Sequence, residues 1–134
     1  MLALPPDVVH WVSRNGQDGD CAIAAISLAT GASYEAVLAE AIQVRSDAVT
    51  VGLNWREIRT TIKRLGFSSR LRRKYDLDED TGILDCKRGR QEHVVYLWEG
   101  RIVEPRWRSM WRDPEAFLKH EDWAPGMLLT LKKD

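Results

Sequence analysis

The sequence changes its hydrophobic period once, close to Gly66, and this change limits the folds open to the chain. Before it, apolar residues recur at helical spacing, which predicts helices over residues 21–30, 34–44 and 55–65. After it, β-branched and aromatic residues gather in short runs typical of strands, over residues 67–73, 82–86, 92–98, 101–105 and 127–133. Helices first and strands afterwards predict an α+β fold with a mostly antiparallel sheet, not the alternating order of a doubly wound sheet.

Capping residues mark where the predicted helices begin. They are Asp20, Ser33, Asn54 and Asp113. Glu57 follows the third of these by three residues, which is the spacing of a capping box. Pro114 stands directly after the fourth, which suits the first position of a short helix over residues 115–120.

The composition is that of a folded chain, and we expect residues 1–134 to form one domain. Hydrophobic residues make up 44% of the chain and include six tryptophans, enough for a core without disulfide or metal support. The 20 basic and 20 acidic residues cancel, and a net charge of zero argues against a general nucleic-acid binder. Acidic residues directly follow the basic stretch at residues 63–74, so we interpret that stretch as a solvated strand edge and turn.

The cysteine pattern and the N-terminal residues indicate where the chain works. No apolar run is long enough to span a bilayer, and the start lacks the basic region of a signal peptide. We therefore expect a cytoplasmic protein with no membrane partner. Cys21 and Cys86 have neither the number of a disulfide framework nor the spacing of zinc ligands, so we expect reduced thiols, no metal and no cofactor.

Cys21 opens the most apolar of the predicted helices, in the stretch NGQDGDCAIAAISLATG at residues 15–31. In the first turn of a helix, unpaired backbone N–H groups and the helix dipole favour a thiolate. The apolar residues that follow indicate a buried helix, which would hold the thiol rigidly. The same pattern also suits a small cysteine packed in a core helix, so the local sequence leaves both interpretations open.

A catalytic thiol needs a base, and the chain offers His10, His93 and His120. The first lies in the N-terminal stretch, and the last closes the short helix, where a cation suits the dipole. His93 begins the most apolar strand, where a titratable group needs a partner. We therefore select His93 as the candidate base.

Glu104 is the expected partner of the His93 ring. The turn at residues 99–100 predicts a hairpin in which Val95 faces Glu104, and this brings Glu104 within diagonal reach of His93. A third group of this kind orients the base in many catalytic sites. A histidine held by a carboxylate is also a common structural motif, so the hairpin alone leaves both interpretations open.

Two segments, GDCAIAAISLATGASYEAV and EHVVYLWEGRIVEP, resemble the papain-like cysteine peptidases of the C39-like kind. That family includes bacteriocin-leader peptidase domains and small stand-alone bacterial and phage proteins. Its pattern has an acidic residue before a cysteine that opens a helix of small residues, then a His-x-Val-Val strand and a hairpin leading to Asp-Pro. The resemblance covers roughly residues 10–132 and implies a papain-like fold, with N-terminal helices packed on the sheet.

The resemblance implies a role for each matching residue. Cys21 matches the nucleophile and His93 the general base, whereas Glu104 takes the place of the family's Asp and is one methylene longer. The family's oxyanion glutamine precedes the cysteine by six positions, where this chain has Asn15. Gln17 lies closer to the cysteine, so it matches by residue type and Asn15 by spacing, and both stay candidates.

The implied activity is a cysteine-dependent peptidase or amide hydrolase that acts on a peptide or protein through a thioester. The alternative is a papain-like fold with little or no activity that serves as a protein-interaction module. The glutamate in place of aspartate and the shifted amide favour this alternative. A third hypothesis, nucleic-acid binding through residues 63–74, is disfavoured by the balanced charge.

Three features outside this set have weaker interpretations. We expect a mostly structural role in the core for a group of tryptophans, Trp98, Trp107, Trp111 and Trp123, although the segment 107–114 has the pattern of a loop that can wall a cleft. Cys86 is expected to pack. Residues 88–90 suit either a basic rim that meets an acidic substrate or a solvated turn.

Overall fold

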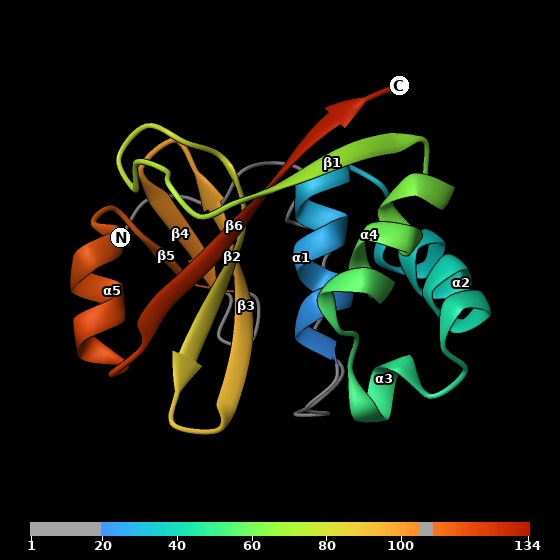
Figure 1. Cartoon of the computed structure of the whole chain (residues 1–134), viewed down its shortest axis with the longest axis horizontal. Coiled ribbons are helices and arrows are strands. Elements are labelled where there is room, and N and C mark those ends of the chain that lie inside the picture. Colours follow the sequence, from blue (N-terminus) through green and yellow to red (C-terminus); the bar gives the residue numbers. More distant parts are fainter. Residues whose placement is uncertain (1–19, 105–108) are drawn as a thin grey trace.

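The computed structural model describes residues 20–104 and 109–134. Its helices are α1 (Asp20–Thr30), α2 (Tyr34–Val44), α3 (Ala48–Val51), α4 (Trp55–Arg64) and α5 (Pro114–His120). Its strands are β1 (Phe67–Arg72), β2 (Gly82–Arg88), β3 (Gln91–Trp98), β4 (Arg101–Glu104), β5 (Ser109–Trp111) and β6 (Ala124–Lys133). Helices α1 to α4 lie on one side of the sheet and α5 lies on the other, so the expected α+β class is confirmed (Figure 1).

The six strands form one sheet in the order β1-β6-β2-β3-β4-β5, and every neighbouring pair is antiparallel. The C-terminal strand β6 lies between β1 and β2, so it joins the start of the sheet to its middle. Strands β3 and β4 form the expected hairpin, with Trp98 paired to Arg101 and Tyr96 to Val103. This register places the start of β3 beside the end of β4.

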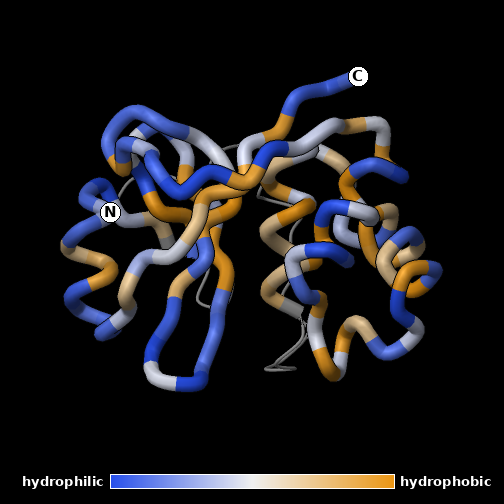
Figure 2. The backbone as a smooth tube through the Cα atoms, viewed as in Figure 1, coloured by the Kyte–Doolittle hydropathy of each residue, from blue (hydrophilic) through white to orange (hydrophobic). Residues whose placement is uncertain are grey.

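The core consists of two hydrophobic clusters, one on each face of the sheet. Ile83 belongs to the cluster that contains α1, whereas its neighbour Leu84 belongs to the cluster that contains Phe117 of α5. Such a change of side between consecutive residues is the period of a strand. In Figure 2 the hydrophobic colour follows α1 and the middle of the strands, while the tip of the β2–β3 hairpin is hydrophilic.

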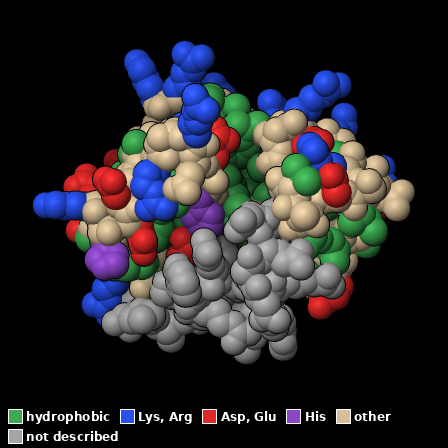
Figure 3. All heavy atoms as spheres, turned by 90° about the horizontal axis from the view of Figure 1, so that it is seen from below, with side chains coloured by type: hydrophobic (Ala, Val, Ile, Leu, Met, Phe, Trp, Pro, Cys, Tyr) green, Lys and Arg blue, Asp and Glu red, His purple; other side chains and the backbone are tan. Residues whose placement is uncertain are grey.

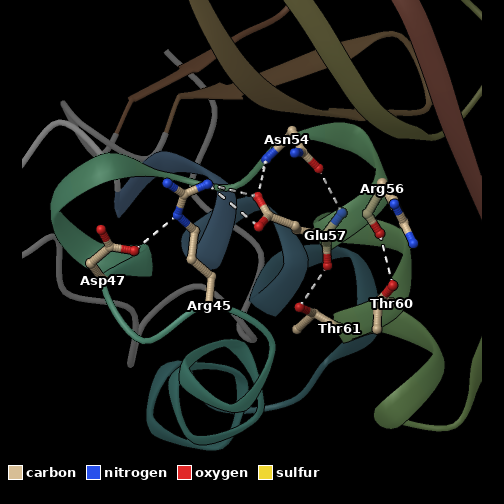
Figure 4. Close-up of polar contacts among 7 residues, drawn as sticks. All are labelled: Arg45, Asp47, Asn54, Arg56, Glu57, Thr60 and Thr61. Carbon is tan, nitrogen blue, oxygen red and sulfur yellow. Dashed lines mark hydrogen bonds and ion pairs between the residues drawn. The ribbon is translucent and has the colours of Figure 1, made fainter.

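The helix caps predicted from the sequence are formed at α2, α4 and α5. At α4, the Asn54 side chain accepts from the Glu57 backbone N–H at 2.9 Å, and the Glu57 carboxylate accepts from the Asn54 N–H at 3.0 Å (Figure 4). The Arg45 guanidinium donates to the same Glu57 carboxylate and so ties the end of α2 to the start of α4. Ser33 and Asp113 accept from backbone N–H groups of α2 and α5.

The structure differs from the expected elements in several places, and strands β2 and β6 are longer than expected. Helix α1 includes Asp20, the residue expected to precede it. The four-residue helix α3 was not expected, because one turn is too short for a periodic pattern. A strand, β5, lies within the segment expected to be a loop, and its three residues pair with β4. Ile42 is 42% exposed, because α2 buries the narrower stripe formed by Tyr34, Val37 and Ala41.

Candidate functional site

Cys21 lies at the N-terminal end of α1, where the helix meets the sheet. Nearly every residue that follows it in α1 is buried, and α1 packs against β3. Cys21 itself is partly buried and packs against the first cluster. The start of α1 and the start of β3 lie at the same end of the molecule (Figure 1). Figure 3 views this end, with hydrophobic side chains between the sheet and the helices and charged ones around them.

His93 and Glu104 meet across the β3–β4 hairpin. Nε2 of His93 lies 2.9 Å from Oε2 of Glu104 and 3.0 Å from Oε1. Both side chains are shielded from water, with 13% of His93 and 4% of Glu104 exposed. The structure therefore places this pair as the hairpin register predicted.

Cys21 lies close enough to the His93 ring to raise its pKa, and this brings the three expected residues together. Burial lowers the pKa of His93, but the side-chain hydrogen bond with Cys21, the one with Glu104 and the charges of both partners raise it by more. The net result is a pKa of about 10, well above the usual 6.5.

The arrangement supports proton transfer between a thiol and an imidazole. A raised pKa keeps the His93 ring protonated at neutral pH, so the ring can give a proton to a group beside it. The Glu104 carboxylate orients the ring and stabilises its positive charge. The trio therefore combines a thiol, an imidazole that can give or take a proton, and a carboxylate that orients the imidazole.

The candidate oxyanion residues Asn15 and Gln17 lie outside the described residues, as does His10. His120 lies at the end of α5, as expected, with 66% of its side chain exposed and an ion pair to Glu121 at 3.5 Å. Within residues 20–104 and 109–134, no group of three His, Cys, Asp or Glu side chains is arranged to hold a metal ion. In the same ranges, none of the helices is long and apolar enough to cross a membrane.

Cys86 packs in the core, as predicted. It is 0% exposed, and β2 pairs it directly with His93 of β3. Burial raises the pKa of the Cys86 thiol, and the charges of Glu104, Asp85 and Cys21 raise it further. Cys86 is therefore an unreactive thiol within reach of the same charges, which makes it an internal reference for Cys21.

Two residues that the sequence did not assign to the site complete its surroundings. The rings of His93 and Trp123 are stacked, with centroids 5.6 Å apart and planes 25° apart. The guanidinium carbon of Arg88 lies 4.2 Å from the centroid of the Trp123 ring. Trp123, which was expected in the core, thus also contacts the His93 ring. Arg88, which was expected in a basic rim or a turn, contacts Trp123.

A separate groove of about 560 Å³ lies between α4 and β1. Apolar Trp55 and Phe67 line it together with cationic side chains, including Lys63 of the basic stretch. Strand β1 is an edge of the described sheet, and Arg72 at its end forms an ion pair with Asp80 at 3.7 Å. The basic stretch thus begins at the end of α4, and from Phe67 to Arg72 it forms the predicted strand edge, with Asp80 of the acidic segment beside its end.

Comparison with protein-family models, curated proteins and solved structures finds no match to this chain.

Proposed function

We propose that this chain is a cysteine-dependent hydrolase of peptide or amide bonds, with Cys21, His93 and Glu104 as its catalytic groups. The observation that carries the proposal is the position of one imidazole, which contacts a helix-terminal thiol and a buried carboxylate at the same time. Either contact alone would also suit a structural residue. Their combination is the geometry that acyl transfer through a thiol requires.

The proposed reaction has two steps. In the first, the Cys21 sulfur attacks the substrate carbonyl, and the resulting tetrahedral species collapses when His93 gives its proton to the leaving amine. This forms a thioester between the acyl group and the sulfur. In the second step, neutral His93 takes a proton from water, the hydroxide attacks the thioester, and the carboxylic acid leaves as the sulfur recovers its charge.

The fold supports a papain-like assignment. A cysteine opens an apolar helix, that helix packs against an antiparallel sheet, and the histidine follows later in the chain on a strand of that sheet. The longer Glu104 side chain reaches His93 at hydrogen-bond distance, so its extra methylene does not prevent the contact that the family's Asp would make. This removes one reason for preferring the inactive alternative.

Thiol labelling tests the proposal, and the chain supplies its own control. We expect iodoacetamide at neutral pH to label Cys21 at least about tenfold faster than Cys86, as read by peptide mass spectrometry, because a positioned imidazolium favours the thiolate. His93→Ala should slow the labelling of Cys21, while the fully buried Cys86 stays slow in both chains. Equal, slow labelling that His93→Ala leaves unchanged would contradict the proposal.

Hydrolysis is tested with a mixed peptide library. The purified chain should cleave some members, and the Cys21→Ser variant should cleave none, because an alcohol beside the same imidazole is a far weaker nucleophile. Fast labelling of Cys21 without any cleavage would contradict the hydrolase and favour the interaction module.

A further inference from the structure

Trp123 contacts the face of the candidate base. Its indole ring is stacked on His93 at a centroid distance of 5.6 Å, which lies within the range of favourable aromatic pairs. Trp123 is itself partly buried and packs against the second cluster. The preceding residue, Asp122, has a φ of 57° and forms a tight turn after α5. The N–H of Trp123 donates to the Leu118 carbonyl at 2.8 Å. The backbone therefore fixes where the indole begins.

Arg88 contacts the Trp123 ring and is itself held by two hydrogen bonds. Its Nη1 donates to the carbonyl of Glu121 at 2.7 Å, and its Nε donates to Oε1 of Gln91 at 3.1 Å. These bonds hold the guanidinium carbon 4.2 Å from the Trp123 ring centroid, a cation–π distance. Arg88 thus joins three parts of the chain, namely the β2–β3 hairpin, the end of α5 and the indole.

We propose that Trp123, held by Arg88, is a positioning residue that sets the plane of the His93 ring. The proposal rests on the role of His93 as the base, and it concerns only how the ring is held. Glu104 fixes one ring nitrogen, but a hydrogen bond at one nitrogen leaves the ring free to rock about that contact. The flat face of Trp123 restricts this motion, so that Nε2 stays on Glu104 and the ring stays beside Cys21.

The indole also limits the access of water to the His93–Glu104 pair. The two side chains are only slightly exposed, and Trp123 covers a ring face that would otherwise widen this exposure. A proton on Nε2 should therefore exchange slowly with solvent. This gives the proposal a readout that does not depend on turnover, so a failure of the hydrolase proposal leaves the positioning testable.

The experiment compares four variants by two measurements. The first measurement is the exchange rate of the His93 Nε2 proton, from NMR of the ¹⁵N-labelled imidazole, and the second is the alkylation rate of Cys21 at neutral pH. Trp123→Ala removes the stacking face, and Trp123→Phe keeps a smaller one. Arg88→Ala removes the cation, and Arg88→Lys keeps the charge but loses the planar fork.

The sheet offers a matched control. Trp98 lies on β3, the strand that carries His93, and like Trp123 it has a guanidinium over its ring, that of Arg101, at 5.2 Å from the ring centroid. It packs against the first cluster and forms no ring contact with His93 among the described contacts. Trp98→Ala therefore removes an indole and a cation–π pair of the same kind from the same strand without touching the stack on His93.

We expect Trp123→Ala to raise proton exchange and lower Cys21 alkylation by about tenfold each, whereas Trp123→Phe and Trp98→Ala stay within about threefold of the parent chain. For Arg88→Ala and Arg88→Lys, the changes in both rates should lie between those of Trp123→Phe and those of Trp123→Ala, since each variant leaves the indole in place but free to move. The proposal is overturned if both rates of Trp123→Ala stay within about twofold of those of the parent chain. It is also overturned if Trp98→Ala changes both rates as much as Trp123→Ala does. Should Trp123→Ala fail to fold, the two Arg88 variants decide: no change in either measurement overturns it.

Discussion

Nε2 of His93 lies 2.9 Å from Oε2 of Glu104, although the two residues belong to different strands. The hairpin explains the contact, because its register pairs Tyr96 with Val103 and so carries Glu104 to a position diagonal to His93. The contact is shielded from water, since both side chains are only slightly exposed. A charged pair in such a position controls the protonation of the ring.

Replacing Glu104 by Gln should lower the pKa of His93. The carboxylate raises that pKa both through its hydrogen bond and through its charge, and glutamine keeps the shape but removes the charge. We expect a decrease of about one unit or more from the parent value of about 10, measured from the imidazole NMR shifts as the pH is varied.

Glu104→Asp is the informative companion to this variant. It keeps the charge but shortens the side chain by a methylene, so its carboxylate should reach Nε2 less closely and lower the pKa of His93 by a smaller amount. An unchanged pKa in Glu104→Gln would show that the contact does not control the ring.

The stability of the chain should depend on pH through His93. Its pKa of about 10 in the folded chain lies above the 6.5 of an unperturbed ring, so the folded state holds the proton more tightly. The stabilisation is therefore complete below about pH 6.5 and is lost as the pH rises through about 10. Urea unfolding across this interval should show a fall in the free energy of unfolding of the parent chain.

His93→Gln supplies the reference for that measurement. The difference in unfolding free energy between parent and variant should shrink by on the order of 1–3 kcal/mol as the pH rises, since other titrating groups affect both chains alike. A difference that stays constant, or grows, over the interval would contradict a raised pKa.

The contact between His93 and Glu104 could be predicted from the sequence alone, because a two-residue turn fixes the register of a hairpin. Local pattern could not bring Cys21 to the same place, since that contact depends on how α1 packs against β3. The residues suggested the pairing only because a catalytic thiol needs a base, and the family resemblance supported it. The expected helix caps at Ser33 and Asn54 depend on residues within one turn, and both were found.

The contacts of Trp123 depend on strand order, which no local pattern contains. Strand β6 lies beside β2, where Ala124 pairs with Lys87 and Pro125 with Cys86. This pairing brings the start of β6 to the hairpin that carries Arg88 and His93. The sequence places β6 last, and no feature in it shows that β6 inserts between β1 and β2 rather than extending the edge at β5.

The cap of α4 should contribute measurably to stability. Asn54→Ala removes the side-chain acceptor of the Glu57 N–H, at a cost of about 1 kcal/mol in the free energy of unfolding, while the backbone N–H of residue 54 still donates to the Glu57 carboxylate. Thr60→Ala is the control on the same helix, because its exposed hydroxyl donates to the Arg56 carbonyl of the preceding turn and takes no part in the cap (Figure 4). Equal effects of the two substitutions on urea unfolding would contradict a specific role for the cap.

Substitution by alanine should destabilise the chain more at Gly100 than at Gly89, the other hairpin glycine. Gly89 and Gly100 both have positive φ, of 60° and 80°, so alanine strains the backbone at either position by about 1 kcal/mol. An added Cβ at Gly100 would lie 2.7 Å from the carbonyl oxygen of Asp78, whereas at Gly89 it would meet nothing within 4 Å. We therefore expect Gly100→Ala to lose about 1–2 kcal/mol more than Gly89→Ala in urea unfolding.

The same pair of variants tests whether the β3–β4 turn controls the site. A shift of that turn moves Glu104 relative to His93, so Gly100→Ala should also lower the pKa of His93, while Gly89→Ala, in the turn between β2 and β3, should leave the β3–β4 register intact. The imidazole NMR titration measures both variants under one set of conditions. Two variants of equal stability and equal His93 pKa would mean that the turn yields to the added methyl group without moving the strands.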